Sequence, residues 1–123
     1  MILADASIWV RHYREGIPLF SSLLANSKII IHSVIIGELA TGNLRQRADT
    51  LQWLSSLPRI PDVDFTDCMT FIETEKLHGL GIGWGDVQLF AALHRDQSAK
   101  LWTLDRRLAT AAAKLSLAFH PSQ

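Results

Sequence analysis

Four acidic residues stand out because of where they fall relative to the expected strands and helices. Asp5 ends the apolar run "MILA", and Asp105 ends a second such run in "LWTLDRRL". Asp86 opens a helical stretch in "GWGDVQLFAAL", and Glu38 lies inside "HSVIIGELATG". Each aspartate could simply cap a helix, since aspartate is a preferred N-cap residue. Several carboxylates without basic partners would instead favour a divalent cation.

Glu38 separates these two interpretations, because a residue in the interior of a helix cannot cap it. It follows Val34 by four residues and Ile35 by three, so helical spacing predicts that it shares their apolar side. A carboxylate on such a side needs a partner or a metal. Oxygen ligands favour Mg²⁺ or Mn²⁺ over zinc, which prefers cysteine and histidine. The sequence therefore predicts a Mg²⁺ or Mn²⁺ site formed by Asp5, Glu38, Asp86 and Asp105.

The other polar motifs are interpreted as structural. The histidines at positions 12, 32, 78, 94 and 120 have no metal-binding spacing, and most are expected at surface or lightly packed positions. Asp62, Asp64 and Asp67 cluster around a loop and a helix start, where they are expected to act as caps. The glycines of "HGLGIGWGD" match no phosphate-loop pattern, so we interpret them as a mobile loop that delivers Asp86.

Short apolar runs alternate with helical periods along the chain. Strands are expected at 1–4, 28–32, 59–63, 100–104 and 117–120. Helices are expected at 7–14, 18–25, 34–41, 48–54, 65–77, 87–95 and 108–115. This alternation predicts an α/β fold with a mainly parallel sheet, and Pro58 and Pro61 place the 59–63 strand at an edge. In such a sheet the ligand site lies at the carboxyl ends of the strands, where strand order reverses.

Length and composition predict a single domain over residues 1–123 with a sizeable core. The chain is 48% hydrophobic and has 12 basic and 12 acidic residues, a balance that argues mildly against a nucleic-acid binder. The balance does not decide the matter, because an enzyme can gather acids at one point and bases around it. No apolar run approaches the roughly 20 residues that span a bilayer. With no leader expected and a single Cys68, the sequence predicts a cytoplasmic protein.

The order and spacing of the four acids resemble those of the PIN-domain ribonucleases, in particular the VapC-type toxins of toxin–antitoxin pairs. The matching residues are Asp5 in "DASIWV", Glu38 in "GELATG", Asp86 in "GDVQLFAAL" and Asp105 in "TLDRRL", with Ser7 and Thr103 as the small hydroxyls beside the first and last acids. The resemblance covers essentially the whole chain. It implies a PIN-like three-layer α/β/α fold with a mainly parallel five-stranded sheet of order 3-2-1-4-5. Asp5 and Asp105 would then lie side by side.

The resemblance also implies an activity and partners. The protein would be an endoribonuclease toxin that uses Mg²⁺ or Mn²⁺ and leaves 5′-phosphate and 3′-hydroxyl ends. Asp5, Asp86 and Asp105 would hold the metal directly or through water, and Glu38 would hold a metal-bound water. Ser7 and Thr103 would orient the acids. The RNA backbone would be held by Arg11, Arg14, Arg106 and Arg107, each of which is equally well explained as a solvated surface charge. The partners would be RNA, a VapB-type antitoxin and a second copy in a homodimer.

Two other functions fit parts of the sequence. A receiver domain of a signalling pair has similar length and an acidic Mg²⁺ pocket, and Asp62 or Asp64 could be its phosphoacceptor. It also needs a lysine after the fifth strand, and "LAFHPSQ" contains none. A catalytically silent PIN-like module that only binds a partner is the second alternative, and the complete set of acids argues against it.

Overall fold

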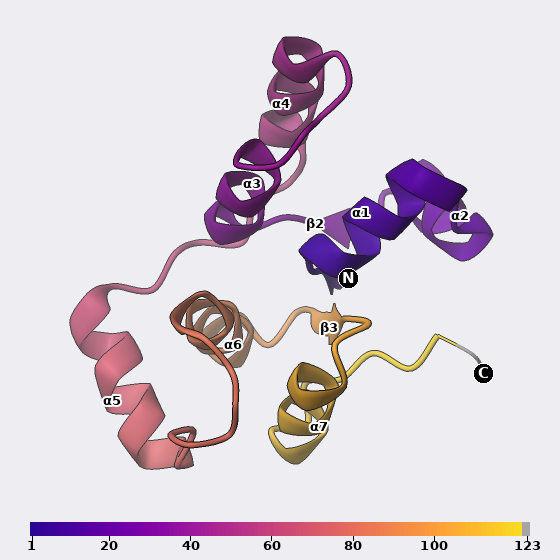
Figure 1. Ribbon diagram of the computed structural model, residues 1–123. Coiled ribbons are helices and arrows are strands. Elements are labelled where there is room, and N and C mark those ends of the chain that lie inside the picture. The colour runs from indigo at the N-terminus through magenta and orange to yellow at the C-terminus, as the bar shows by residue number, and fades with distance from the viewer. Residues whose placement is uncertain (122–123) are drawn as a thin grey trace.

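Three short strands lie between two groups of helices in the computed structural model, which describes residues 1–121 (Figure 1). Helices α1 to α4 occupy the upper part of the view and α5 to α7 the lower part. The elements in chain order are β1 (Ile2–Ala4), α1 (Ala6–Glu15), α2 (Pro18–Ala25), β2 (Ile29–Ile30), α3 (Ser33–Ala40), α4 (Arg47–Ser56), α5 (Phe65–Glu75), α6 (Trp84–Asp96), β3 (Lys100–Trp102) and α7 (Arg106–Lys114). Every helix expected from the sequence is present, and within these residues no helix is long and apolar enough to cross a membrane.

The sheet is parallel and has β1 at its centre, in the order β2-β1-β3. Leu3 pairs with Ile30 on one side and Leu101 on the other. All residues of β1 are buried, as expected of a parallel strand covered on both faces by helices. The central strand therefore ends in a buried part of the molecule.

Of the five strands expected, the three inner ones form the sheet within residues 1–121. The two outer segments each contribute one parallel bridge, Ile31 with Arg59 and Leu101 with Ala118, so the prediction of full strands there is wrong. Pro58 and Pro61 flank the first bridge and cannot donate to a ladder, which explains why pairing stops after one residue.

The topology reverses next to β1. The chain passes from β1 to β2 on one side of the sheet, and β3 lies on the other side of β1. Each of these parallel strands leads toward a helix that a polar side chain caps, namely Asp5 for α1, His32 for α3 and Asp105 for α7. Strand order thus brings three capping side chains to one edge of the sheet, where open α/β sheets bind ligands.

Candidate carboxylate site at the strand ends

Asp5 lies directly after β1 and is only 7% exposed. Its Oδ1 accepts hydrogen bonds from the backbone N–H groups of Ser7 (3.0 Å) and Ile8 (3.3 Å), which cap α1. The Ser7 hydroxyl also donates to Oδ1, and the Thr103 hydroxyl donates to Oδ2. Burial raises the pKa of Asp5 and outweighs these hydrogen bonds, which lower it. An ionised carboxylate at this depth therefore gains from a nearby cation.

The Ser7 and Thr103 hydroxyls also connect Asp5 to the segment that follows β3. Ser7 Oγ accepts from the Leu104 N–H at 3.0 Å, and Thr103 Oγ1 accepts from the Asp105 N–H at 3.0 Å. Because each hydroxyl oxygen accepts a hydrogen bond from a backbone N–H, the hydroxyl proton is free to be donated to the carboxylate. The resemblance places these hydroxyls beside the first and last acids, and in the structure both donate to the first, Asp5.

Glu38 and Asp86 lie on helices that approach each other closely at a glycine. A Cβ on Gly85 of α6 would sit 3.2 Å from Val34 Cγ1 of α3, so the missing side chain lets the helices approach. Glu38 is one turn beyond Val34, and Asp86 follows Gly85. The pKa of Glu38 is raised by burial and then by the negative charges of Asp86 and Asp5. Three carboxylates therefore share one electrostatic neighbourhood.

Glu38 itself differs from its sequence-based description. The prediction that it shares a buried side of its helix is wrong, because the residue as a whole is exposed. The buried stripe of α3 runs through Ile35 and Leu39. One residue is a rotation of about 100° around a helix, which places Glu38 at the margin of that stripe. It is partly desolvated there, and within residues 1–121 its carboxylate makes no hydrogen bond or ion pair.

Asp86 and Asp105 both act as caps. Asp86 Oδ2 accepts from the Gly83 N–H at 3.0 Å at the start of α6, and Asp105 Oδ1 accepts from the Leu108 N–H at 3.0 Å at the start of α7. Asp105 is exposed and is not among the charges that raise the pKa of Glu38. Its backbone N–H donates to the Thr103 hydroxyl, which in turn donates to Asp5.

The donor chemistry of the site fits a divalent cation. Asp5, Glu38 and Asp86 offer only carboxylate oxygens, the ligands preferred by Mg²⁺ and Mn²⁺. Burial raises the pKa of Asp5 and of Glu38, and within residues 1–121 no basic side chain forms an ion pair with Asp5, Glu38 or Asp86. In the described part of the chain, no three acidic, histidine or cysteine side chains are close enough to enclose an ion. The acids are neighbours at an open site rather than a closed shell.

Two grooves lie on the surface of the molecule, and the first of them reaches this edge of the sheet. The first, of about 410 Å³, is lined by Ser7, Arg11, Arg14 and Leu104 together with Ala6, Val10 and Glu15. It therefore adjoins Asp5 through Ser7. The second, of about 290 Å³, lies along α7 and includes Arg106 and Arg107. The four arginines expected at the RNA thus line two grooves, and all four are exposed.

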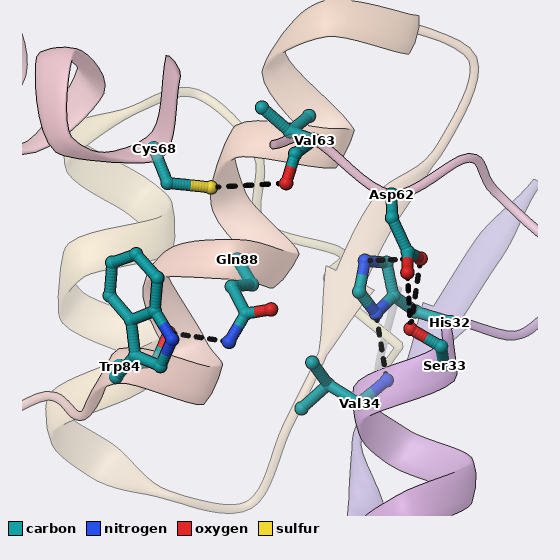
Figure 2. A network of polar contacts seen from close by, with 8 residues as sticks. All are labelled: His32, Ser33, Val34, Asp62, Val63, Cys68, Trp84 and Gln88. Atoms are coloured by element: carbon teal, nitrogen blue, oxygen red, sulfur yellow. Dashed lines mark hydrogen bonds and ion pairs between the residues drawn. The ribbon is translucent and has the colours of Figure 1, made fainter. Parts of the chain in front are cut away.

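His32 forms a second polar cluster that sequence reasoning missed (Figure 2). The other four histidines are exposed or partly exposed, as expected of most of them, and His32 is the exception at 0% exposed. Its Nδ1 accepts from the Val34 N–H at 3.0 Å, so the neutral ring carries its proton on Nε2, which faces Asp62 Oδ1 at 3.4 Å. The Ser33 hydroxyl donates its one proton to the Asp62 carboxylate and lies 2.9 Å from Oδ1 and 2.8 Å from Oδ2. The position of His32 between a strand and a helix, as at Asp5, could have indicated a cap for α3, but not its burial or its contact with Asp62.

Burial lowers the pKa of His32, the Asp62 charge opposes this, and Arg59 adds to the lowering. The imidazole is consequently held neutral, and in that state it can cap α3, the helix that carries Glu38. Protonation would convert Nδ1 from an acceptor into a donor and break the cap.

Comparison with known proteins points to one family over nearly the whole chain. The family model described as PIN domain matches residues 2–114. Ribonuclease VapC32 from two strains of Mycobacterium tuberculosis is 33% identical over 118 residues, which cover 96% of this chain and 95% of the relative.

Proposed function

Because the chain belongs to the PIN-domain family, we propose that it is a metal-dependent endoribonuclease and the toxin of a type II toxin–antitoxin pair. The full-length similarity to a protein named ribonuclease VapC32 supports the activity. The observation that carries the proposal is the buried Asp5, held by two hydroxyls where β1 and β3 end, with Glu38 and Asp86 within its electrostatic reach.

The residues have three proposed tasks, which are to hold a cation, to orient Asp5 and to hold the RNA backbone. Asp5, Glu38 and Asp86 would hold a divalent cation, Mg²⁺ or Mn²⁺, with Asp105 reaching it through water. When bound, the cation supplies a Lewis acid that offsets phosphate charge and lowers the pKa of the attacking water. Ser7 and Thr103 keep the Asp5 carboxylate in one orientation and leave an Oδ2 lone pair free.

The substrate backbone would lie along the first groove. Arg11 and Arg14 line that groove next to Ser7, so their guanidinium groups can hold phosphates beside Asp5. An RNA held there presents its phosphodiester to the carboxylate edge of the sheet. Cleavage would leave 5′-phosphate and 3′-hydroxyl ends.

The proposal includes partners and the finer features of the fold. A VapB-type antitoxin would cover the crevice with its C-terminal segment, where an arginine or lysine could replace the cation among the carboxylates. The free toxin would pair as a homodimer and act in the cytoplasm, where its RNA is. We also propose that the two bridged segments complete the family's five-strand order, 3-2-1-4-5.

A cleavage assay tests this function directly. Purified protein should cut RNA with Mg²⁺ or Mn²⁺, stop when excess EDTA is added and resume when the metal is restored. The reason is that the acids activate water only through a bound divalent cation. Ligation of the products to a 5′-phosphate-dependent adaptor would read the chemistry of the ends. Asp5→Asn should remove the activity, whereas Asp49→Asn, which neutralises an exposed acid on α4, should not. Cleavage that continues undiminished in excess chelator would falsify the proposal.

A further inference from the structure

Helix α7 presents a groove lined by cations and by no acid. Its lining residues are Leu80, Arg106, Arg107, Thr110, Ala111 and Lys114, and its volume is about 290 Å³. The chain as a whole has 12 basic and 12 acidic residues, so three cations around one groove are a strong local imbalance. Such an imbalance attracts a polyanion even when the net charge is zero.

The glycine-rich loop before α6 lies against one of these cations. Gly81 has φ +78°, a conformation that residues with a side chain rarely adopt. A Cβ there would lie 2.8 Å from Arg107 Cδ and 2.9 Å from Arg107 Nη1. The Arg107 side chain therefore lies directly against the Gly81 backbone. A side chain confined on one side by backbone has fewer conformations to lose when a ligand binds.

The position of the arginines on α7 is not explained by helix stability. Arg106 and Arg107 occupy the first turn, where the helix dipole disfavours positive charge, whereas Lys114 is in the favourable last turn. Arg106, Thr110 and Lys114 are spaced by four residues and so follow one side of the helix. The cations and the positive end of the dipole act together on any anion in the groove.

We propose that this α7 groove binds the phosphate backbone of RNA beside the segment that is cut. The inference rests on the proposed function and extends it to a second RNA contact. The groove begins at Arg106, directly after Asp105, whose N–H reaches Asp5 through the Thr103 hydroxyl. A strand lying over the carboxylate edge can therefore continue along α7. Cations there offset the repulsion between the acids and the RNA.

The first test is equilibrium binding of a fluorescent, unstructured 2′-O-methyl RNA oligonucleotide in EDTA, which isolates binding from cleavage. Arg107→Ala and Lys114→Ala should each weaken binding about three- to tenfold. Each should also lower the slope of log K against log salt by about 0.7, the value for one phosphate contact on a single strand. Arg45→Ala makes the same charge change at an exposed site between α3 and α4 and serves as the control.

If Arg107→Ala and Lys114→Ala weaken binding no more than Arg45→Ala does, the groove is not an RNA site. Thermal melts of each variant must match the wild-type protein, so that lost binding is not lost folding. Poly-glutamate provides a further arm. If it competes for the groove as well as RNA of equal charge does, the occupant is an acidic protein segment and the proposal is overturned.

A double-mutant cycle tests the role of the loop. Gly81→Ala should displace the Arg107 side chain and weaken RNA binding, because the added Cβ overlaps it. Gly81→Ala combined with Arg107→Ala should bind no more weakly than Arg107→Ala alone, since both remove the same contact. Fully additive losses would show that Gly81 acts independently of Arg107.

The two proposals fail in different ways. If the wild-type protein does not cut RNA with Mg²⁺ or Mn²⁺, the proposed function is wrong, whatever the binding data show. If it cuts RNA and the α7 variants bind and cut like the wild-type protein, the function stands and this inference is wrong.

Discussion

The turns at Asp5 and Asp105 have the same design in sequence and different surroundings in space. Both aspartates follow neighbouring parallel strands and cap the next helix. Asp5 is 7% exposed and receives four hydrogen bonds, two from backbone and two from hydroxyls. Asp105 is exposed and its carboxylate receives one. Asp5 ends the central strand directly, whereas Thr103 and Leu104 separate Asp105 from the end of β3.

The difference teaches that the burial of a carboxylate, rather than its role as a helix cap, makes the carboxylate suited to binding a cation. At Asp105 the charge is solvated and the helix cap is a complete explanation. At Asp5 the charge is desolvated enough to raise its pKa despite four donors, so a cation is favoured there. His32 is the third cap at this edge and is buried too, but it is neutral and needs no cation.

The largest expected effect separates Asp5 from Asp105 in activity. Asp5→Asn should bring RNA cleavage below detection, because it removes a ligand charge from the buried site. Asp105→Asn should leave measurable cleavage, since asparagine also caps a helix and the exposed charge reaches a cation only through water. The measurement is single-turnover cleavage at saturating Mg²⁺. Equal losses from the two substitutions would show that the comparison of depth does not predict function.

The next effect concerns the hydroxyls that serve Asp5. Thr103→Val and Ser7→Ala should each lower the cleavage rate about 10- to 100-fold, the usual cost of losing a residue that orients a metal ligand. Thr103→Ser keeps the hydroxyl and should restore most of the rate. Ser55→Ala on the exposed part of α4 is the matched control. A Thr103→Ser variant as slow as Thr103→Val would mean that the methyl group, not the hydroxyl, is required.

A smaller effect distinguishes the two turns in stability. Asp105→Ala should lower the free energy of unfolding by about 1 kcal/mol, because the Leu108 N–H loses its cap. Asp105→Asn should change it much less. Asp5→Asn should leave stability in EDTA unchanged or higher, since a buried charge with a raised pKa is removed. Urea unfolding curves would measure all three, and a marked loss of stability for Asp5→Asn would contradict the assignment.

The smallest effect is a pH dependence at the third cap. Because the pKa of His32 is lowered in the folded protein, the unfolded chain binds more protons, and stability should fall as pH drops below about 6.5. His32→Asn retains a capping side chain that does not titrate, so its melting temperature should depend less on pH. His78→Asn, at an exposed histidine, should keep the wild-type slope. Identical slopes for all three proteins would show that His32 does not titrate in this range.

The sequence was sufficient to predict the helices, the inner strands and the edge of the sheet at which the acids lie. Apolar runs bounded by caps predicted β1 and β3, and alternation with helices predicted that they are parallel. The outer strands were overpredicted, because a single bridge and a full strand have the same local composition. At Arg59, the flanking prolines already indicated an edge and in fact limit pairing to one residue.

Individual side chains were harder to predict than elements. Helical periodicity placed Glu38 on the correct helix, but the margin of a buried stripe and its centre differ by one residue step. The burial of His32 and its contact with Asp62 depend on a segment 30 residues away, which no local pattern reports. The roles of Asp5, Glu38, Asp86 and Asp105 at a cation stay predictions.

The hydroxyl contacts at Asp5 join two segments that lie far apart in the sequence. Thr103 lies 98 residues beyond Asp5, and the Leu104 N–H lies 97 beyond the Ser7 hydroxyl that it meets. A ribosome therefore makes Thr103 98 residues after the acid, and the central strand lacks β3 as a neighbour until then. Until Thr103 is made, the nascent chain carries an Asp5 carboxylate that has only its local partners at Ser7 and Ile8. The order of synthesis itself therefore delays assembly of the site until β3 and the segment after it have been made.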